Sequence, residues 1–219
     1  MNNIQKGIVM KNLEKLVSGY KRFLNADFKD FEGRYQTLAE HGQSPKVMVI
    51  ACSDSRVNPD LIFNSKPGDL FVVRNVANLV PPYEPDDKHH STSAALEFAV
   101  KALKVEHIVI MGHSLCGGVK ACCEAVNGNA VDGEFIPRWT SLLHDCAREV
   151  QGHDLPSEEF GVAVEKAAVK TSIQNLQSFP FVVDAMKERG MILHGAYFDV
   201  SNAQLYALDH GTHEFMAVE

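Results

Sequence analysis

The stretch that decides the fold is VMVIACSDSR, residues 47–56 of a chain of 219 residues. Its first six residues, from Val47 to Cys52, form an apolar run without alternating polar residues. Such a run is typical of a strand that is buried on both faces in a parallel sheet. Polar and charged residues follow at once, so the sequence places a cysteine and an Asp–Arg pair at the carboxyl end of a buried strand.

Similar apolar runs recur along the chain and alternate with helical patterns. We expect further strands at residues 70–73, 107–112, 191–200 and 204–208, the last one an antiparallel edge strand after a turn. We expect helices at residues 10–25, 27–41, 91–103, 117–126, 136–151, 158–178 and 181–189. A strand, a helix and a strand at this spacing form a right-handed crossover unit. The predicted fold class is α/β, with a central, mostly parallel sheet of four to five strands flanked by helices.

The length of the chain fits one domain, residues 1–219, with a sizeable core. Two of the predicted helices precede the first strand, so we divide the domain into an N-terminal helical arm, residues 1–44, and an α/β core, residues 45–219. The arm must either pack on its own domain or clasp a partner chain.

The composition, 45% hydrophobic and 22% charged residues, is that of a folded globular protein. A net charge of -7 disfavours a general nucleic-acid binder, which would more often carry a basic excess. There is no apolar run of the ~18 residues that would cross a membrane. The first residues also lack the long apolar region of a secretory signal, so the expected location is cytoplasmic.

Five cysteines, an odd number, do not suggest a disulfide framework. Cys122, Cys123 and Cys146 fall on predicted helices, where we expect core or surface thiols. Cys52 and Cys116 differ because each stands at or just after the end of a predicted strand. Ligands of open α/β sheets bind beyond such carboxyl ends.

A metal site is predicted where these two strands end. His113 and Cys116 form a His-x-x-Cys turn, and Cys52 can supply a third ligand from the neighbouring strand end. Two thiolates and one imidazole suit Zn²⁺, one ion per chain. Three protein ligands leave a fourth position for water, which is the arrangement of a catalytic zinc site.

Asp54 and Arg56 follow the first of these cysteines closely, and at this spacing they can form a bidentate ion pair. Such a pair keeps the carboxylate ionised and aimed at the metal, where it can accept a hydrogen bond from bound water. Most Asp–Arg pairs are surface salt bridges worth about 0–1 kcal/mol. The position of this pair beside a predicted zinc ligand favours a catalytic role instead.

Three stretches resemble the signatures of the β-class carbonic anhydrases: CSDSR at residues 52–56, HSLCGG at 113–118 and GDLFVVRNVAN at 68–78. The resemblance covers most of the chain. It implies a lyase in which Cys52, His113 and Cys116 hold zinc and a zinc-bound hydroxide hydrates carbon dioxide reversibly to bicarbonate and a proton. It also implies that Asp54 and Arg56 are the catalytic dyad.

The sequence is similar to the plant-like, open-site subgroup of that family, in which Asp pairs with Arg. Val49 stands where the bicarbonate-regulated subgroup has Trp. The resemblance implies that Gln43 hydrogen-bonds the substrate and that Phe71, Val76 and Phe98 line an apolar pocket. Phe98 departs from the Tyr of the plant enzymes.

The two glycines after Cys116, Gly117 and Gly118, let backbone N–H groups approach the substrate oxygen. The expected partners are carbon dioxide and bicarbonate. The N-terminal helices resemble arms that wrap a neighbouring subunit, which implies a homodimer at least, with a tetramer or larger assembly expected.

Three alternatives remain on the sequence alone. A carbonyl sulfide or carbon disulfide hydrolase would use the same fold and zinc on a linear analogue of carbon dioxide. A non-catalytic zinc protein would gain little from the Asp54–Arg56 pair. A thiol nucleophile enzyme with His113 would explain neither the second cysteine nor the arginine.

Overall fold

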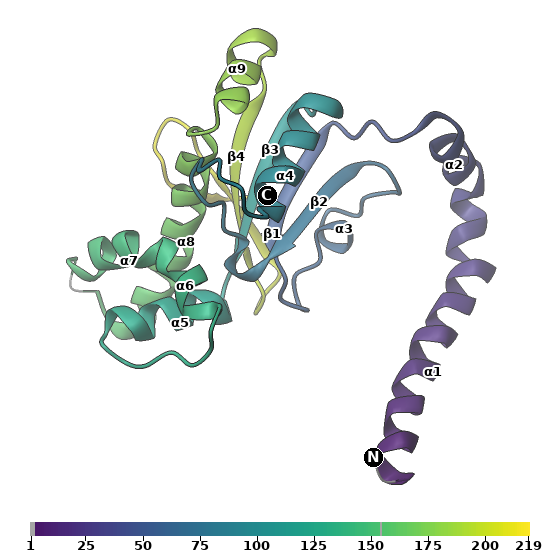
Figure 1. Ribbon diagram of the computed structural model, residues 1–219, viewed down its shortest axis with the longest axis horizontal. Coiled ribbons are helices and arrows are strands. Elements are labelled where there is room, and N and C mark those ends of the chain that lie inside the picture. The colour runs from purple at the N-terminus through teal and green to yellow at the C-terminus, as the bar shows by residue number, and fades with distance from the viewer. Residues whose placement is uncertain (1–2, 154) are drawn as a thin grey trace. The chain divides into compact units, whose positions relative to one another are not determined.

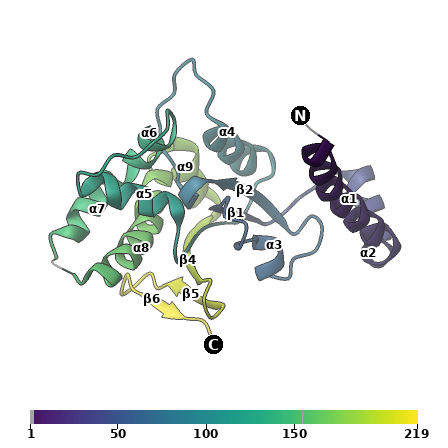
Figure 2. The same cartoon turned by 90° about the horizontal axis from the view of Figure 1, so that it is seen from below.

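The computed structural model describes residues 3–153 and 155–219, and the chain divides into two compact units, Met1–Gln43 and Ser44–Glu219. The first unit consists of α1 (Asn3–Asn25) and α2 (Asp27–His41). These helices lie side by side because the rings of Phe23, Phe28 and Tyr35 pack together, with centroids 5.4–6.2 Å apart (Figure 2). The division falls next to the boundary expected after residue 44.

One face of α1 is apolar and exposed. Leu13, Leu16, Val17 and Tyr20 recur at the spacing of one helical face, and the side chain of Leu16 is 72% exposed. None of the helices in the described residues is both long and apolar enough to cross a membrane.

The second unit contains a six-stranded sheet in the order β2-β1-β3-β4-β5-β6. Figure 1 labels β1 to β4 of this sheet, and Figure 2 labels β5 and β6. Its strands are β1 (Val47–Cys52), β2 (Leu70–Asn75), β3 (His107–His113), β4 (Ile192–Asp199), β5 (Gln204–Leu208) and β6 (Phe215–Ala217). The first four strands in chain order are parallel, and β5 and β6 add an antiparallel edge. This confirms the predicted class of fold.

The strand β6 is additional to the four to five strands expected. It covers three residues, too few for a recognisable pattern in the sequence. The turn before it is set by Asp209, whose carboxylate accepts hydrogen bonds from the backbone N–H groups of Gly211 and Thr212. A polar turn of this kind returns the chain along β5.

The α-helices of the second unit are α3 (Pro59–Ile62), α4 (Ser91–Glu97), α5 (Gly117–Val126), α6 (Ile136–Thr140), α7 (His144–Gln151), α8 (Ser157–Leu176) and α9 (Pro180–Arg189). A π-helix, η2 (Phe98–Ala102), continues α4, and two 3₁₀ turns are η1 (Val76–Asn78) and η3 (Ser141–Leu143). The helix expected over residues 136–151 is therefore broken into α6, η3 and α7. The Thr140 hydroxyl donates to the carbonyl of Ile136, a bond that bends helices.

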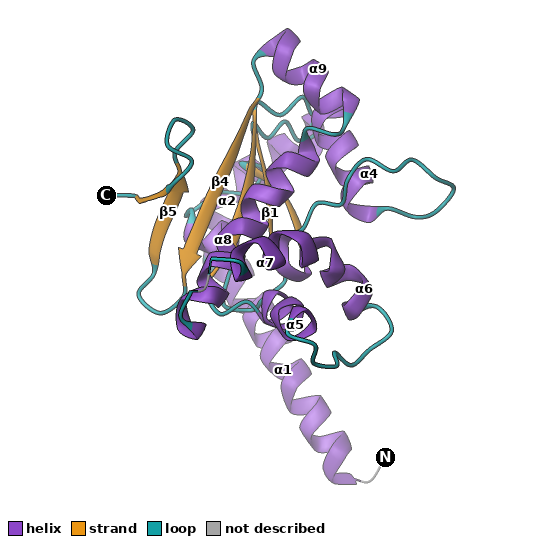
Figure 3. Ribbon diagram, turned by 90° about the vertical axis from the view of Figure 1, so that its left-hand side faces the viewer, coloured by secondary structure: helices purple, strands orange, loops and turns teal. Residues whose placement is uncertain are grey.

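Both faces of the central strand β1 are buried, as its continuous apolar run predicts, whereas β2 at the edge of the sheet is only half-buried. Met48 and Ile50 of β1 belong to the core formed with α4, α8 and α9, and Figure 3 shows α8 lying along the sheet. Val49 and Ala51 point to the opposite face, where Val57 lies in the same core cluster. Full burial of one such side chain contributes about 1.5–3 kcal/mol.

The close packing of α8 on β3 depends on Gly112. A Cβ atom there would lie 2.6 Å from Cγ2 of Val169. We expect Gly112→Ala to lower the free energy of unfolding by about 1–3 kcal/mol, because the methyl group overpacks this contact. Urea unfolding of the metal-free protein measures it.

The matched control is Gly161→Ala, within α8, where an added Cβ would meet nothing within 4 Å. That change should raise stability by up to about 1 kcal/mol through helix propensity. Equal effects of the two substitutions would contradict this packing argument.

Candidate active site

The site forms where β1 and β3 end together. The two strands are parallel neighbours, with Ala51 opposite Met111, so their carboxyl ends meet at one edge of the sheet. This places Cys52, at the end of β1, beside the segment that carries His113 and Cys116. The ligand atoms of these three residues lie within 4.8 Å of one another, and all three residues are buried.

The donor set fits a zinc ion. The His113 Nδ1 lies 2.9 Å from the carbonyl oxygen of Ser114, to which it donates, so Nε2 is left as a lone-pair donor. Nε2 is buried and has no hydrogen-bond partner among the described residues. Two sulfurs 3.9 Å apart complete the set. A bound metal explains the unpaired nitrogen, which would otherwise be costly to bury.

The two thiols are electrostatically different. A hydrogen bond from Cys116 lowers the pKa of Cys52, and the same contact raises the pKa of Cys116. The backbone N–H groups of Asp54 and Ala77 also favour the Cys52 thiolate. Ala77 adopts a left-handed backbone, with φ 63° and a fully buried side chain. Strained backbone of this kind is found where a function needs it.

Asp54 and Arg56 form the bidentate pair that their spacing predicts. The Arg56 Nε donates to Oδ1 of Asp54 at 2.9 Å, and a terminal nitrogen donates to Oδ2 at 2.8 Å. The Arg56 guanidinium holds the pKa of Asp54 well below its usual range, so the carboxyl stays ionised. The same guanidinium donates to the carbonyl of Leu115 at 3.0 Å, which links the loops after β1 and β3.

Sequence reasoning assigned no role to Arg74, which clamps the loop after β1. Its side chain donates to three carbonyl oxygens, those of Cys52, Asp54 and Val57, at 2.6–2.9 Å. The feature of the sequence that could have revealed this role is that Arg74 directly follows the apolar run of β2.

A second residue that the sequence reasoning missed is Glu165 of α8. It is 6% exposed, and its carboxylate accepts the backbone N–H of Cys116 at 2.8 Å. Burial raises the pKa of this carboxyl. The feature of the sequence that could have revealed Glu165 is its position between Val164 and Ala168, because an acidic residue on the apolar face of a predicted helix needs a polar partner.

Three of the predicted substrate-binding residues lie around the cluster. A Cβ on Gly118 would stand 2.7 Å from Cγ1 of Val76, so the start of α5 packs directly on η1. The backbone N–H of Gly118 lies toward the Cys116 thiol and favours its thiolate. Gly117 is exposed at the first position of α5.

The two predicted pocket phenylalanines lie elsewhere in the same chain. Phe71 pairs with Met48, four residues before the Cys52 end of the strand, which is about 13 Å along a strand. It packs against Phe98 with ring centroids 5.9 Å apart, and Phe98 is 49% exposed. Gln43 is exposed at the end of the first unit.

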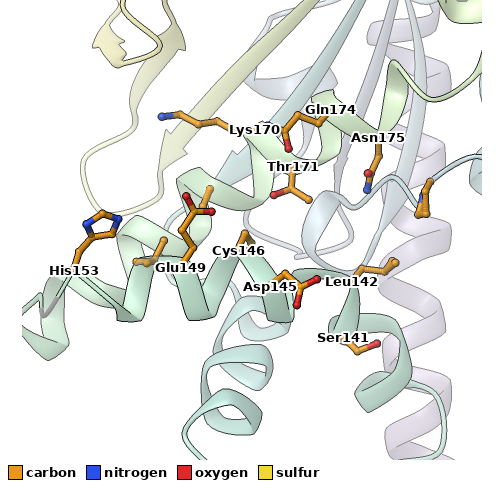
Figure 4. Close-up of a pocket in the computed structure, with 13 residues that line it drawn as sticks. Ser141, Leu142, Asp145, Cys146, Glu149, His153, Lys170, Thr171, Gln174 and Asn175 are labelled. Carbon is orange, nitrogen blue, oxygen red and sulfur yellow. The ribbon is translucent and has the colours of Figure 1, made fainter.

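A cavity of about 700 Å³ lies between α7 and α8 (Figure 4). The described residues that line it include Cys146, Glu149, His153 and Lys170, and the Cys52–His113–Cys116 cluster is not among them. Charged side chains of both signs face this space. Because none of the three cluster residues lines it, the cavity is separate from the Cys52–His113–Cys116 cluster.

Comparison with known proteins agrees with this geometry. Residues 47–205 match the family model described as carbonic anhydrase. The chain is 36% identical over 205 residues to "Beta carbonic anhydrase 3" of Arabidopsis thaliana, covering 91% of this chain and 79% of that protein.

Solved structures are similar too. The β-carbonic anhydrase CcaA shares 30% identity at a TM-score of 0.86, over 95% of this chain and 93% of that one. The enzyme CafA of Aspergillus fumigatus shares 33% identity at 0.80, over 90% and 91%. A structure described as one of two tetrameric β-carbonic anhydrases from Sordaria macrospora shares 29% identity at 0.78, over 90% and 97%.

The three remaining cysteines should be unreactive. Burial raises the pKa of Cys122 to about 12 and that of Cys123 to about 11, and it also raises the pKa of Cys146. Because the thiolate is the reactive form, about 10⁻⁴ of Cys122 is ionised at pH 8, against roughly a quarter of an ordinary thiol. We expect slow labelling of these thiols by iodoacetamide in zinc-loaded protein, rising about tenfold per pH unit.

Peptide mass spectrometry after labelling at pH 7, 8 and 9 measures this rate for each cysteine. In guanidinium chloride all five cysteines should react quickly. Rapid labelling of Cys122 in the folded protein at pH 8 would contradict the burial argument.

Proposed function

We propose that this chain, which belongs to the β-class carbonic anhydrase family, catalyses the reversible hydration of carbon dioxide to bicarbonate and a proton with one zinc ion. The observation that carries the proposal is the juxtaposition of a buried Cys52–His113–Cys116 cluster with an ionised carboxylate two residues from Cys52. A purely structural metal site would have no need of the Asp54–Arg56 pair.

Cys52 Sγ, His113 Nε2 and Cys116 Sγ would hold the zinc. When bound, the ion would lower the pKa of its water to about 7 and so supply a strong nucleophile at neutral pH. The protein contributes the position of the three donors. Clamped by Arg74, the loop after β1 holds Cys52 still, and the Ser114 carbonyl holds the His113 ring.

Asp54 would accept a hydrogen bond from the attacking water and orient it. The Arg56 guanidinium keeps the Asp54 carboxyl from accepting a proton at neutral pH. Both oxygens of Asp54 are bonded to Arg56, which supports an open site with a fourth position for water. This favours the plant-like subgroup.

The substrate is a small apolar molecule that becomes an anion. We place it beside Val76, with the N–H of Gly117 at the start of α5 available to the developing negative charge. Gln43, Phe71 and Phe98 would then act across a subunit interface, as the exposure of Phe98 and the distance of Phe71 from Cys52 suggest.

We further propose a homodimer or larger assembly in which the exposed apolar face of α1 packs on a second copy. A related structure from Sordaria macrospora is described as tetrameric. A face of four large apolar side chains in water favours burial against a partner. A cytoplasmic location stays a prediction.

Asp54→Asn should reduce carbon dioxide hydration by at least about 10²-fold, because the amide keeps the shape and loses the fixed acceptor charge. Stopped-flow hydration on protein of measured zinc content checks this. Asp86→Asn, at another carboxylate paired with a basic side chain, is the matched control and should retain activity.

Full zinc without hydration would overturn the reaction and redirect the assay to carbonyl sulfide and carbon disulfide. Protein that binds no zinc after refolding with the metal would overturn the site itself.

Leu16→Glu should dissociate the assembly, because it places a charge on the exposed apolar face of α1. Analytical ultracentrifugation measures the mass. Ser18→Glu adds the same charge to the polar side of α1 and should leave the mass unchanged. A wild-type protein that sediments as a 24.2 kDa monomer would refute the proposed assembly.

A further inference from the structure

We propose that Glu165 is a positioning residue that fixes Cys116 for the metal through the Cys116 backbone N–H, and that Tyr197 holds the Glu165 carboxylate in place. This role rests on the metal site of the proposed function. It concerns how tightly that site retains its ion, and neither residue is given a part in the chemical step.

Both oxygens of the buried carboxylate are engaged. Oε1 accepts the N–H of Cys116 at 2.8 Å, and Oε2 accepts the O–H of Tyr197 at 2.7 Å. Glu165 and Tyr197 are 6% and 3% exposed. An ionisable group is costly to bury, and hydrogen bonds to a carboxylate are among the stronger ones in proteins. A residue needed only to fill this space would not carry a carboxyl group.

The contact holds one particular peptide unit. The Leu115 carbonyl and the Cys116 N–H belong to the same planar group, and in a trans peptide they point in opposite directions. Arg56 donates to the carbonyl at 3.0 Å, and Glu165 accepts from the N–H. The peptide is therefore held on one side by an exposed guanidinium and on the other by a buried carboxylate.

This peptide needs external support because the backbone around it is strained. Leu115 has a left-handed backbone, with φ 58°, and its side chain is 68% exposed, so its own packing does little to hold that conformation. Cys116 follows in an extended conformation before α5 begins. A rotation of the Leu115–Cys116 peptide would move the Cys116 sulfur.

The helix that carries Glu165 is placed by its packing on β3. A Cβ at Gly112 would collide with Val169 and would lie 3.6 Å from the carbonyl oxygen of Glu165, so α8 comes as near as a glycine allows. Tyr197 of β4 is the register partner of Gly112. The ammonium group of Lys166 lies 5.4 Å from the Tyr197 ring centroid and supports the ring.

Four variants test the role. Glu165→Ala removes the acceptor, Glu165→Gln keeps a carbonyl oxygen for the Cys116 N–H, and Tyr197→Phe removes the donor to the carboxylate. Asn175→Ala is the control, since it deletes a hydrogen bond from α8 to the Val80 carbonyl, away from Cys116. The first readout is the rate of zinc release to a chromogenic chelator.

We expect zinc release from Glu165→Ala to be 10–100-fold faster, the usual effect of losing a partner that orients a metal ligand. Glu165→Gln should stay within about threefold of wild type, and Tyr197→Phe should fall between the two. Asn175→Ala should lower the melting temperature without changing the release rate. The cobalt-substituted protein gives a second readout, because the thiolate charge-transfer band should change in Glu165→Ala and recover in Glu165→Gln.

The role would be overturned if folded Glu165→Ala released zinc at the wild-type rate and its cobalt spectrum were unchanged. It would also be overturned if Glu165→Gln released zinc as fast as Glu165→Ala does. If Glu165→Ala does not fold, Tyr197→Phe decides, and wild-type release from it overturns the role. None of these readouts uses turnover. Absence of carbon dioxide hydration would therefore refute the proposed function and leave the positioning role to be judged separately.

Discussion

β1 and β3 run side by side in the same direction, and the hydrogen bonds between them set Ala51 opposite Met111. Because of this pairing, two loops that are about 60 residues apart in the chain begin at the same edge of the sheet. The side chains of Cys52 and His113, which are proposed metal ligands, come together only in this register. The remaining contacts of the site hold these two loops once the strands have placed them.

The charges at this edge are held in place by partners. Asp54 is held by Arg56, the Cys52 thiolate is favoured by backbone N–H groups, and Glu165 is bonded on both oxygens. Arg74 is the reverse case, a cation that carbonyl oxygens surround. Hydrogen-bonding groups that are already held in position need little reorganisation when a reaction changes the charge of a nearby group. They can therefore stabilise charged states more effectively than mobile water does.

The sequence predicted the parts of the structure that arise from local patterns. A continuous apolar run predicted β1, and a turn followed by an edge strand predicted β5, both at their observed bounds. The position of Cys52, His113 and Cys116 at strand ends predicted a cluster of possible metal ligands, which the structure contains. The residues it missed act at long range. Arg74 clamps carbonyls about 20 residues away, and Glu165 reaches a backbone N–H 49 residues away. No spacing pattern indicates such contacts, because the first depends on the pairing of β2 with β1 and the second on how closely α8 packs on the sheet.

The register of the strands also explains the place of Phe71. A resemblance assigns a residue to a pocket without saying which copy of the chain the pocket belongs to. Pairing Phe71 with Met48 puts its ring far from Cys52 along the strand, and the half-exposed Phe98 lies beside it. Distances along a strand of this kind become available only when the partner residues are known.

The peptide between Leu115 and Cys116 joins two parts of the site that are usually considered separately. Arg56, which fixes the Asp54 carboxylate, also holds the carbonyl of the peptide whose N–H is bonded to Glu165. A substitution at position 56 would therefore disturb Cys116, a proposed metal ligand, as well as the Asp54–Arg56 pair, and the activity lost would reflect both effects. Because both side chains bond the same peptide, we expect a double-mutant cycle to show positions 56 and 165 to be coupled, so that tolerance of a change at one depends on which residue stands at the other.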